Sequence, residues 1–391
     1  MNNFTFYSPT YFAFGKDTEN AVGSYVRRFG GNKVLIHYGG GSVVRSGLLD
    51  RVKASLDGES IPYVLLGGVM PNPRNSLVYE GIELCRREDV DFILAVGGGS
   101  TIDSAKAIAA GVPYDGDFWD FYNGKPIKTA LPVGTVLTIA AAGSEGSANT
   151  VITHENGMLK RGTGSDALRP KFSILNPALT QTLPPYQTAC GITDILAHLY
   201  ERYITDTPEV EVTDRLIEGL MLTLIHEAPR VIANPDNYDA RANIMWAGTL
   251  AHNNVCGVGR RQDWTSHGLE HELSALYDCA HGAGLAVTMP AVFTYVMHKD
   301  VMRFAQVAVR VWGCTMDEQN PENTARAGIE ALRQFLISIG MPKNFAELGA
   351  KEEDIPYMVD TLMVNKGQNG VVPGFLPLTV EDCANIYRLM L

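Results

Sequence analysis

The first half of the chain alternates short apolar runs with helical patterns. Five apolar runs predict buried strands: Lys33 to Tyr38, Tyr63 to Leu66, Phe92 to Val96, Pro132 to Leu137 and Phe172 to Leu175. Between them, apolar residues recur at helical spacing over 43–56, 76–87 and 101–111. Strand, glycine turn, helix and strand in this order are typical of a parallel sheet with crossover helices. We therefore expect an α/β domain with a Rossmann-like parallel sheet.

The second half has a different pattern, in which long helical stretches replace the strands. Such stretches cover 195–204, 212–229, 240–254, 301–312 and 322–340. The change follows Leu183-Pro184-Pro185, and a proline pair disfavours helix immediately before it. A chain of 391 residues also exceeds what one hydrophobic core usually supports. The prediction is an α/β domain over 1–185 and an all-helical domain over 186–391.

Composition narrows the class of protein. The chain is 46% hydrophobic and 19% charged, as expected for a globular protein with a large core. Its formal net charge of −11 argues against nucleic acid and anionic membranes as partners. The sequence opens without a basic and then apolar leader, and no apolar run nears ~20 residues. Six scattered cysteines without a Cys-x-x-Cys pair favour free thiols and a cytoplasmic location.

Two glycine turns follow predicted strands and suit a phosphate group. Gly97, Gly98 and Gly99 with Ser100 join an apolar strand to a helix, and Gly39 to Ser42 repeat the arrangement earlier. Glycine lets a ligand approach the backbone, and a helix N-terminus offers N–H groups and a positive dipole end. The carboxyl ends of parallel strands meet at one edge, where ligands bind. The spacing is not Gly-x-Gly-x-x-Gly, so simple tight turns stay an alternative.

Two further features bear on the cofactor. A loop of small residues, Thr138 to Ser147, follows another strand and can lie flat against a ligand, although an ordinary surface loop fits equally well. No acidic residue follows Tyr38, where a carboxylate would hold an adenosine ribose and repel a 2′-phosphate. This absence, with Ser42 as a donor, leans toward NADP(H), although an uncharged site also accepts NAD(H).

Carboxylate and imidazole side chains gather in the second half. Asp194 and His198 are four residues apart in a helical stretch, so both lie on one face of the helix. His267 and His271 have the same spacing, and His281 follows soon after. One carboxylate with imidazoles suits Fe(II), Zn(II), Mn(II) or Co(II). Polar pairs at this spacing are also common on ordinary helices, so the pattern alone leaves both interpretations open.

The ordered motifs resemble one known family essentially from end to end. They are FTFYSPTYFAFGK, YGGGSV, PNP at 71–73, AVGGGSTIDSAKAIA, GSE at 143–145, LPP at 183–185 and the Asp/His set. This combination is similar to the iron-containing (group III) alcohol dehydrogenases, in their butanol dehydrogenase and broad aldehyde reductase branch. One departure is visible, because 142–147 is Ala-Gly-Ser-Glu-Gly-Ser where the family commonly has Thr-Gly-Ser-Glu-Val-Thr.

The resemblance implies a role for each matching residue. The implied metal ligands are Asp194, His198, His267 and His281. The residues implied to contact the cofactor are Gly40, Gly41, Ser42, Gly97, Gly98, Gly99, Ser100, Asp103, Thr138, Ser147 and Leu179. Among these, the 97–100 turn would hold the pyrophosphate, and the 40–42 turn would surround the adenosine ribose. His271 would lie near the nicotinamide and the substrate.

The implied activity is the interconversion of primary alcohols, such as butanol, and aldehydes. One divalent metal, Fe(II) or Zn(II), would act as a Lewis acid, and hydride would pass to or from a nicotinamide in a cleft between the domains. His271 is a candidate proton relay, and a packing role serves it equally well. The alternatives are a metallohydrolase that uses the Asp/His site and a glycerol or diol dehydrogenase of the same superfamily. The resemblance also implies a homodimer.

Overall fold

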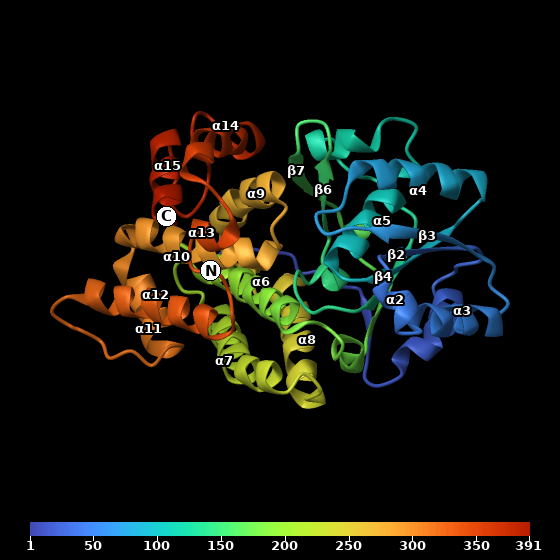
Figure 1. The fold of residues 1–391 in the computed structure, drawn as a ribbon, viewed down its shortest axis with the longest axis horizontal. Helices are drawn as coiled ribbons and strands as arrows, with labels where there is room; N and C mark the ends of the chain where they lie inside the picture. The colour runs from blue at the N-terminus through green and yellow to red at the C-terminus, as the bar shows by residue number, and fades with distance from the viewer. The chain divides into compact units, whose positions relative to one another are not determined.

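The computed structural model describes residues 1–391, which form two compact units. The α/β unit comprises Tyr7–Leu183, and the helical unit comprises Met1–Phe6 with Pro184–Leu391. Figure 1 shows the strands within the first unit and helices throughout the second. The predicted fold class, a parallel α/β sheet domain followed by a helical domain, is confirmed. None of the helices combines the length and the apolar character that crossing a bilayer requires.

Six parallel strands form the main sheet, in the order β1-β8-β5-β4-β2-β3. They are β1 (Tyr11–Phe14), β2 (Val34–Gly39), β3 (Tyr63–Val69), β4 (Phe92–Gly97), β5 (Val133–Leu137) and β8 (Phe172–Leu175). β4 pairs with β2 on one side and β5 on the other, and all of its residues are buried. This burial explains its unbroken apolar sequence, because a central parallel strand is covered on both faces.

Three strands were absent from the sequence-based prediction. β1 lies at the sheet edge, and its exposed Tyr11 and Phe14 interrupt the buried pattern of a central strand. The other two, β6 (Asn149–His154) and β7 (Leu159–Gly164), form an antiparallel hairpin. The β7 sequence, LKRGTG, has too few apolar residues to signal a strand, so its pairing with β6 defines it.

Five α-helices connect the strands of the α/β unit. They are α1 (Val22–Arg28), α2 (Ser42–Arg45), α3 (Leu48–Gly58), α4 (Asn75–Arg87) and α5 (Gly99–Gly111). Short 3-10 turns are η1 (Thr18–Ala21), η2 (Phe118–Asn123), η3 (Ser144–Gly146), η4 (Asp166–Leu168) and η5 (Pro177–Thr180). The helical pattern over 43–56 is two helices, because Gly47 between them has a left-handed φ of +69°. α5 packs against β4 and is buried along nearly its whole length.

The helical unit is built around one buried helix, α6 (Pro185–Tyr203). The other α-helices are α7 (Glu211–Ala233), α8 (Tyr238–His252), α9 (Thr265–Tyr277), α10 (His281–Val296), α11 (Val301–Arg310), α12 (Pro321–Ser338), α13 (Phe345–Leu348), α14 (Ile355–Lys366) and α15 (Val380–Arg388). The 3-10 turns are η6 (Met297–Lys299) and η7 (Glu352–Asp354). α6 packs against α7, α8, α9 and α10, and every residue of it from Thr188 onward is buried. Its polar side chains therefore need partners inside the unit.

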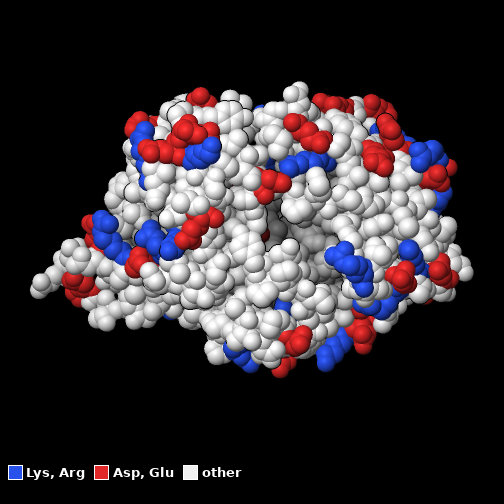
Figure 2. Space-filling model, viewed as in Figure 1, with Lys and Arg blue, Asp and Glu red and all other residues white.

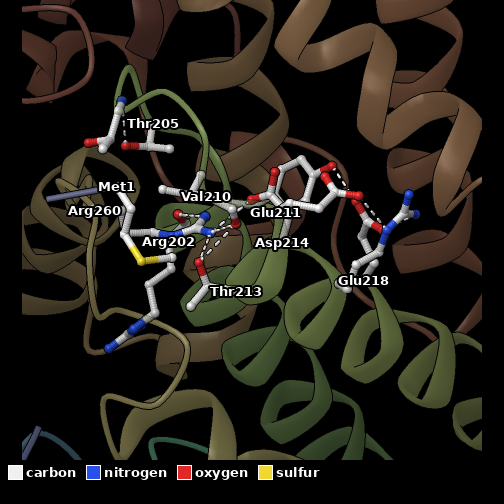
Figure 3. A network of polar contacts seen from close by, with 12 residues as sticks. Met1, Arg202, Thr205, Val210, Glu211, Thr213, Asp214, Glu218 and Arg260 are labelled. Atoms are coloured by element: carbon white, nitrogen blue, oxygen red, sulfur yellow. Dashed lines mark hydrogen bonds and ion pairs between the residues drawn. The ribbon is translucent and has the colours of Figure 1, made fainter.

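A buried ion-pair network joins several helix ends in this unit. Figure 3 shows Arg260 reaching the first turn of α7, where it meets Asp214 at 2.8 Å. The same guanidinium donates to the carbonyl oxygen of Arg202 at 2.8 Å, and Asp214 also accepts from Arg303 at 2.6 Å. Burial works to raise the pKa of Asp214, but the two guanidinium groups lower it on balance. Because these charges are paired, the network fixes the segment that precedes α9.

The first six residues lie with the helical unit. The ammonium group of Met1 donates to the carbonyl oxygen of Pro208 at 2.8 Å. The backbone N–H of Asn2 donates to the carbonyl oxygen of Gly259 at 2.8 Å. These bonds tie the segment to the two loops that flank the Arg260 network.

The surface charges are mixed in sign. On the face drawn in Figure 2, lysine and arginine are interspersed with aspartate and glutamate in small groups, separated by broad uncharged areas. An extended basic surface, the electrostatic footprint of nucleic-acid binding, does not occur on this face.

Candidate functional site

Three helices of the helical unit bring the four expected metal ligands together. α6 carries Asp194 and His198 one turn apart, and both side chains are buried. His267 lies in the first turn of α9, and His281 is the first residue of α10. We call these four residues the Asp194 cluster.

The cluster is centred on one carboxylate oxygen. Asp194 Oδ1 lies 3.4 Å from His198 Nδ1, 3.5 Å from His267 Nε2 and 3.7 Å from His281 Nε2. Two donor atoms bound ~2.1 Å from one tetrahedral metal ion would themselves be ~3.4 Å apart. The spacing therefore fits donors arranged around a common cation.

Several donor atoms of the cluster lack hydrogen bonds. Asp194 Oδ1, His198 Nδ1 and His267 Nε2 are buried and have no hydrogen-bond partner. Buried polar atoms are nearly always paired, so unpaired atoms that converge need an explanation. A divalent cation bound by carboxylate and imidazole would satisfy all of them at once. The ligand atoms of Asp194, His267 and His281 lie within 4.8 Å of one another and fit such an ion in type and spacing. His198 joins them through its Nδ1, 3.4 Å from Asp194 Oδ1.

Two buried glutamates stand behind the histidines. Glu201 of α6 accepts from the His267 Nδ1, and from its backbone N–H at 3.0 Å. Glu270 of α9 accepts in the same way from the Nδ1 of His281. A carboxylate on one ring nitrogen fixes the imidazole so that the other nitrogen faces the cluster. Sequence analysis missed both, although each glutamate lies three residues after a cluster histidine on its helix.

The cluster favours positive charge at His267. Burial works to lower the pKa of His267, but the carboxylates of Glu201 and Asp194 raise it to about 10. His198 behaves differently, because burial and the neighbouring His252 and His267 rings hold its pKa well below the ordinary range. A neutral imidazole such as His198 is the form that binds metals.

His271 lies beside the Asp194 cluster without facing its central oxygen. It is buried on α9, one turn after His267. Its ring centroid is 5.7 Å from that of His281 and 6.4 Å from that of His267. Donor atoms of Glu270, His271 and His281 lie within 4.8 Å of one another. His271 is thus a neighbour of the cluster through His281.

A second group that sequence analysis missed surrounds His198. The His252 ring centroid lies 4.3 Å from the His198 centroid, and Trp264 packs edge-on against both rings. The buried Arg202 donates to His252 Nδ1 at 2.8 Å and to the carbonyl oxygen of His198 at 2.8 Å. His252 has no periodic relation to the cluster in sequence, because it comes from the end of α8.

The expected cofactor residues lie in the α/β unit, mostly beyond strand ends. The 40–42 turn follows β2, the 97–100 turn closes β4 and opens α5, Thr138 follows β5, and Leu179 follows β8. These four strands are neighbours in the order β8-β5-β4-β2. Because all are parallel, their carboxyl ends share one edge of the sheet, where ligands of open α/β sheets bind.

Packing requires glycine at two positions of the 97–100 turn, since a Cβ atom on Gly97 would lie 2.7 Å from Thr101 Cβ. A Cβ atom on Gly98 would lie 2.2 Å from Ile139 Cγ2, and one on Gly99 would lie 3.1 Å from Ala142 Cβ. The loop after β5 therefore rests on the turn, and the backbone N–H of Thr138 donates to the Gly97 carbonyl at 3.0 Å. The 40–42 turn differs, because a Cβ on Gly40 would meet nothing within 4 Å.

Asp103 and Ser147 take part in a compact polar arrangement. Asp103 accepts from Ser144 Oγ at 2.6 Å and from the backbone N–H of Val151 at 3.0 Å. Ser147 Oγ accepts from the backbone N–H of Asn149 at 3.3 Å. Burial raises the pKa of Asp103. Both residues thus shape the loop that leads from β5 to β6.

Comparison with known proteins extends over the whole chain. The family model for iron-containing alcohol dehydrogenase matches residues 9–177, and the model for the C-terminal part of the Fe-containing alcohol dehydrogenase family matches 188–391. An NADH-dependent butanol dehydrogenase A of Clostridium acetobutylicum is 39% identical over 390 residues, 99% of each chain. An NADPH-dependent aldehyde reductase of Escherichia coli is 38% identical over 377 residues, 94% of this chain and 96% of that protein.

Solved structures agree with these matches. The crystal structure of NADH-dependent butanol dehydrogenase A from Thermotoga maritima has a TM-score of 0.96 and 41% identity, over 100% of this chain and 99% of that one. The resemblance predicted from the motifs is confirmed, and so is the predicted enzyme class, an oxidoreductase of the alcohol dehydrogenase type. The chain belongs to the iron-containing alcohol dehydrogenase family.

Proposed function

We propose that this protein is a metal-dependent alcohol dehydrogenase and aldehyde reductase that prefers NADP(H) and acts on primary alcohols and their aldehydes. One divalent cation would be held by Asp194, His198, His267 and His281. The observation that carries the proposal is the convergence of three imidazole nitrogens on Asp194 Oδ1, at 3.4–3.7 Å. Relatives named as a butanol dehydrogenase and an aldehyde reductase support the substrate class.

Each unit has a distinct task in this chemistry. When bound, the cation supplies Lewis acidity to the substrate oxygen, and the nicotinamide carries the hydride. Glu201 and Glu270 orient His267 and His281, so the donor atoms need little rearrangement during the reaction. In the α/β unit, the glycine turns offer backbone N–H groups to the phosphates of the cofactor.

His271 has a separate proposed role as proton relay. Imidazole is the usual side chain for proton transfer near neutral pH, and the place of His271 beside His281 suits transfer between the reacting oxygen and solvent. If His271→Ala leaves the rate and its pH profile unchanged, His271 only packs against the cluster.

Arg45 supports the preference for NADP(H). The first turn has no carboxylate after Tyr38, and the exposed Arg45 places Nη1 only 2.4 Å from where a Cβ on Gly41 would lie. No carboxylate of the chain pairs with this guanidinium, so it is available to an adenosine 2′-phosphate. The names of the relatives do not support this preference, because those at 39–40% identity are named as NADH-dependent butanol dehydrogenases, and the NADPH-dependent aldehyde reductase is 38% identical.

Neither of the two alternative activities is favoured by these relatives, which are named as butanol dehydrogenases and an aldehyde reductase. A metallohydrolase would use the Asp194 cluster to activate water, but glycine turns at neighbouring strand ends would then have no purpose. A glycerol or diol dehydrogenase would use the same turns and cluster with a different alcohol. The deciding experiment is a steady-state panel of C2–C6 aldehydes and short diols with NADPH and NADH, on protein loaded with Fe(II) or Zn(II). Absence of nicotinamide turnover with every substrate would contradict the proposal.

We also propose a cytoplasmic homodimer. β1 is an edge strand with one free side, and it presents exposed Tyr11 and Phe14. Such an edge pairs readily with the same strand of a second copy. The six free cysteines fit a reducing compartment. Light scattering of the purified protein checks the dimer, and Phe14→Lys should shift it toward monomer.

A further inference from the structure

Lys106 is a charged side chain buried inside the α/β unit. It lies on α5 and its side chain is fully buried. Its ammonium group donates at 2.7 Å to the Ser144 carbonyl, at 2.9 Å to the Ser147 carbonyl and at 2.9 Å to the Asn149 carbonyl. The hydroxyls of Ser144 and Ser147 lie at 3.0 and 3.3 Å. All five oxygens belong to one segment, which we call the 144–149 loop.

A second side chain of α5 forms hydrogen bonds with the same loop. Asp103, three residues before Lys106, accepts from the Ser144 hydroxyl at 2.6 Å. Its other carboxylate oxygen accepts from the backbone N–H of Val151, within β6, at 3.0 Å. Lys106 therefore holds oxygens of the loop, while Asp103 holds a donor at the start of the loop and one just beyond its end.

A buried ammonium is a costly way to fill a helix–sheet core. Taking a charge out of water is unfavourable unless hydrogen bonds replace the lost solvent. Apolar residues surround Lys106 along α5, so a hydrophobic residue would serve packing alone. The cation is useful because three backbone carbonyls that face one point need a donor, and a lysine has three N–H groups.

The 144–149 loop continues a segment that touches the phosphate turn. Ile139 and Ala142, just before the loop, lie against Gly98 and Gly99. The start of this segment is tied to Gly97 by the backbone bond from Thr138. Lys106 anchors the other end, where Ser173 and Arg169 also donate to loop carbonyls. Lys106 makes more of these bonds than either, so its contacts help to set how the 138–149 segment lies over the carboxyl ends of β4 and β5.

We infer that Lys106 is a positioning residue for the nicotinamide cofactor, acting by holding the 144–149 loop in the shape that the cofactor contacts. The inference rests on the proposed function, because it takes the glycine-turn edge of the sheet as the cofactor site. Lys106 itself stays beneath the loop and touches neither substrate nor cofactor. Its loss should weaken cofactor binding and leave metal binding intact, since the proposed ligands all belong to the helical unit.

The test compares Lys106→Met with Lys33→Met. Lys33 directly precedes β2, so it lies at the amino ends of the parallel strands, away from the glycine turns. Its ammonium group pairs with Glu88 at 3.2 Å. For the folded protein, checked by circular dichroism, we expect the NADPH dissociation constant of Lys106→Met to rise about tenfold. We expect bound metal, and the KM for aldehyde at saturating NADPH, to stay within about twofold of wild type. Lys33→Met should match wild type in every measurement.

Two results would overturn the inference. One is a folded Lys106→Met protein that binds NADPH as tightly as wild type, which would make Lys106 a purely structural residue. If Lys106→Met does not fold, Ser144→Ala removes the hydroxyl that bridges Lys106 and Asp103, and we expect NADPH binding about threefold weaker. The second result that would overturn the inference is unchanged NADPH binding in Ser144→Ala. Failure of the proposed function looks different, because wild-type protein would then not oxidise NADPH with any aldehyde.

Discussion

The Asp194 cluster and the 144–149 loop differ in whether their buried polar atoms have hydrogen-bond partners. In the cluster, ligand atoms from three helices converge, and those of Asp194, His198 and His267 have no hydrogen bond. Glu201 and Glu270 accept hydrogen bonds from the far side of the His267 and His281 rings. In the loop, Lys106 donates to the carbonyl oxygens of Ser144, Ser147 and Asn149. Ser173 and Arg169 donate to the carbonyl oxygens of the two residues between, Glu145 and Gly146. One region is open to a ligand, and the other is satisfied internally.

This difference separates direct ligands from supporting residues. Unpaired convergent atoms can bind a cation without breaking existing bonds, whereas Asp103 would first have to release Ser144 and Val151. We therefore propose that Asp103 and Ser147 serve the cofactor site through the shape of the loop and not through their own polar atoms. The predictions that follow test this distinction from the largest expected effect to the smallest.

Asp194→Asn should have the largest effect. The amide keeps the size of the side chain but removes the negative charge around which the three histidines gather. We expect metal content near zero and activity reduced more than ~100-fold, with the NADPH dissociation constant unchanged. Metal analysis and binding titration measure the two quantities. Asp206→Asn, an exposed acid of the same unit that pairs with Arg261 at 3.0 Å, is the control. Retained metal and rate in Asp194→Asn would remove Asp194 from the ligand set.

Glu201→Gln should have the next largest effect. The amide no longer stabilises the imidazole as the carboxylate does, so the orientation and basicity of His267 change. We expect metal affinity to fall by ~10–100-fold while the ligands themselves are intact. The matched control is Glu227→Gln, another buried glutamate of the helical unit, which pairs with Arg230 at 2.7 Å. Equal metal affinity in Glu201→Gln and wild type would mean that Glu201 does not orient the site.

The sequence predicted the Asp194 cluster better than the contacts of the 144–149 loop, because the cluster follows helical periodicity. Asp194 and His198 lie one turn apart, so a helix places them on one face before any tertiary contact is known. The same rule could have found Glu201, three residues after His198. Lys106 gives no such signal, because its partners are 38 to 43 residues away and only folding brings them beneath it.

In the fold too, features set by neighbouring residues were predicted, and features set by residues distant in sequence were missed. The strands with unbroken apolar runs, such as β4, were predicted almost to the residue. The β6–β7 hairpin was missed because pairing between its strands, rather than their apolar content, defines it. Likewise, the reason for glycine at 98 is the approach of Ile139, which is 41 positions further along the chain. A turn motif in sequence cannot separate that packing need from the approach of a ligand.

Arg45→Ala should change cofactor preference. Loss of the guanidinium beside the 40–42 turn removes a positive charge that only a 2′-phosphate would use. We expect the KM for NADPH to rise about tenfold, the KM for NADH to stay constant, and the difference to shrink at high salt. Lys53→Ala on α3, which pairs with Asp50 at 3.6 Å, is the control for net charge. Equal changes for NADPH and NADH would remove Arg45 from the recognition of the 2′-phosphate.

The smallest expected effect is a pH dependence of cofactor binding that originates in the loop. Burial lowers the pKa of Lys106 to about 8, against the opposing effect of Asp103 and Glu145, while Arg169 lowers it further. Below pH 8 the group is an ammonium with three N–H donors. Above pH 8 it becomes an amine with two, which no longer satisfies three carbonyls.

Cofactor affinity should therefore fall by a few fold as the pH rises from about 7 to about 9. The free energy of unfolding should instead rise with pH above about 8. The unfolded lysine keeps its proton to higher pH than the buried one, so deprotonation above pH 8 removes the cost of burying the charge. Titration of NADPH at each pH measures affinity, and chemical denaturation measures stability. Lys106→Met should lose both pH dependences together. If that variant keeps the dependence of NADPH binding, the titrating group lies outside the 144–149 loop.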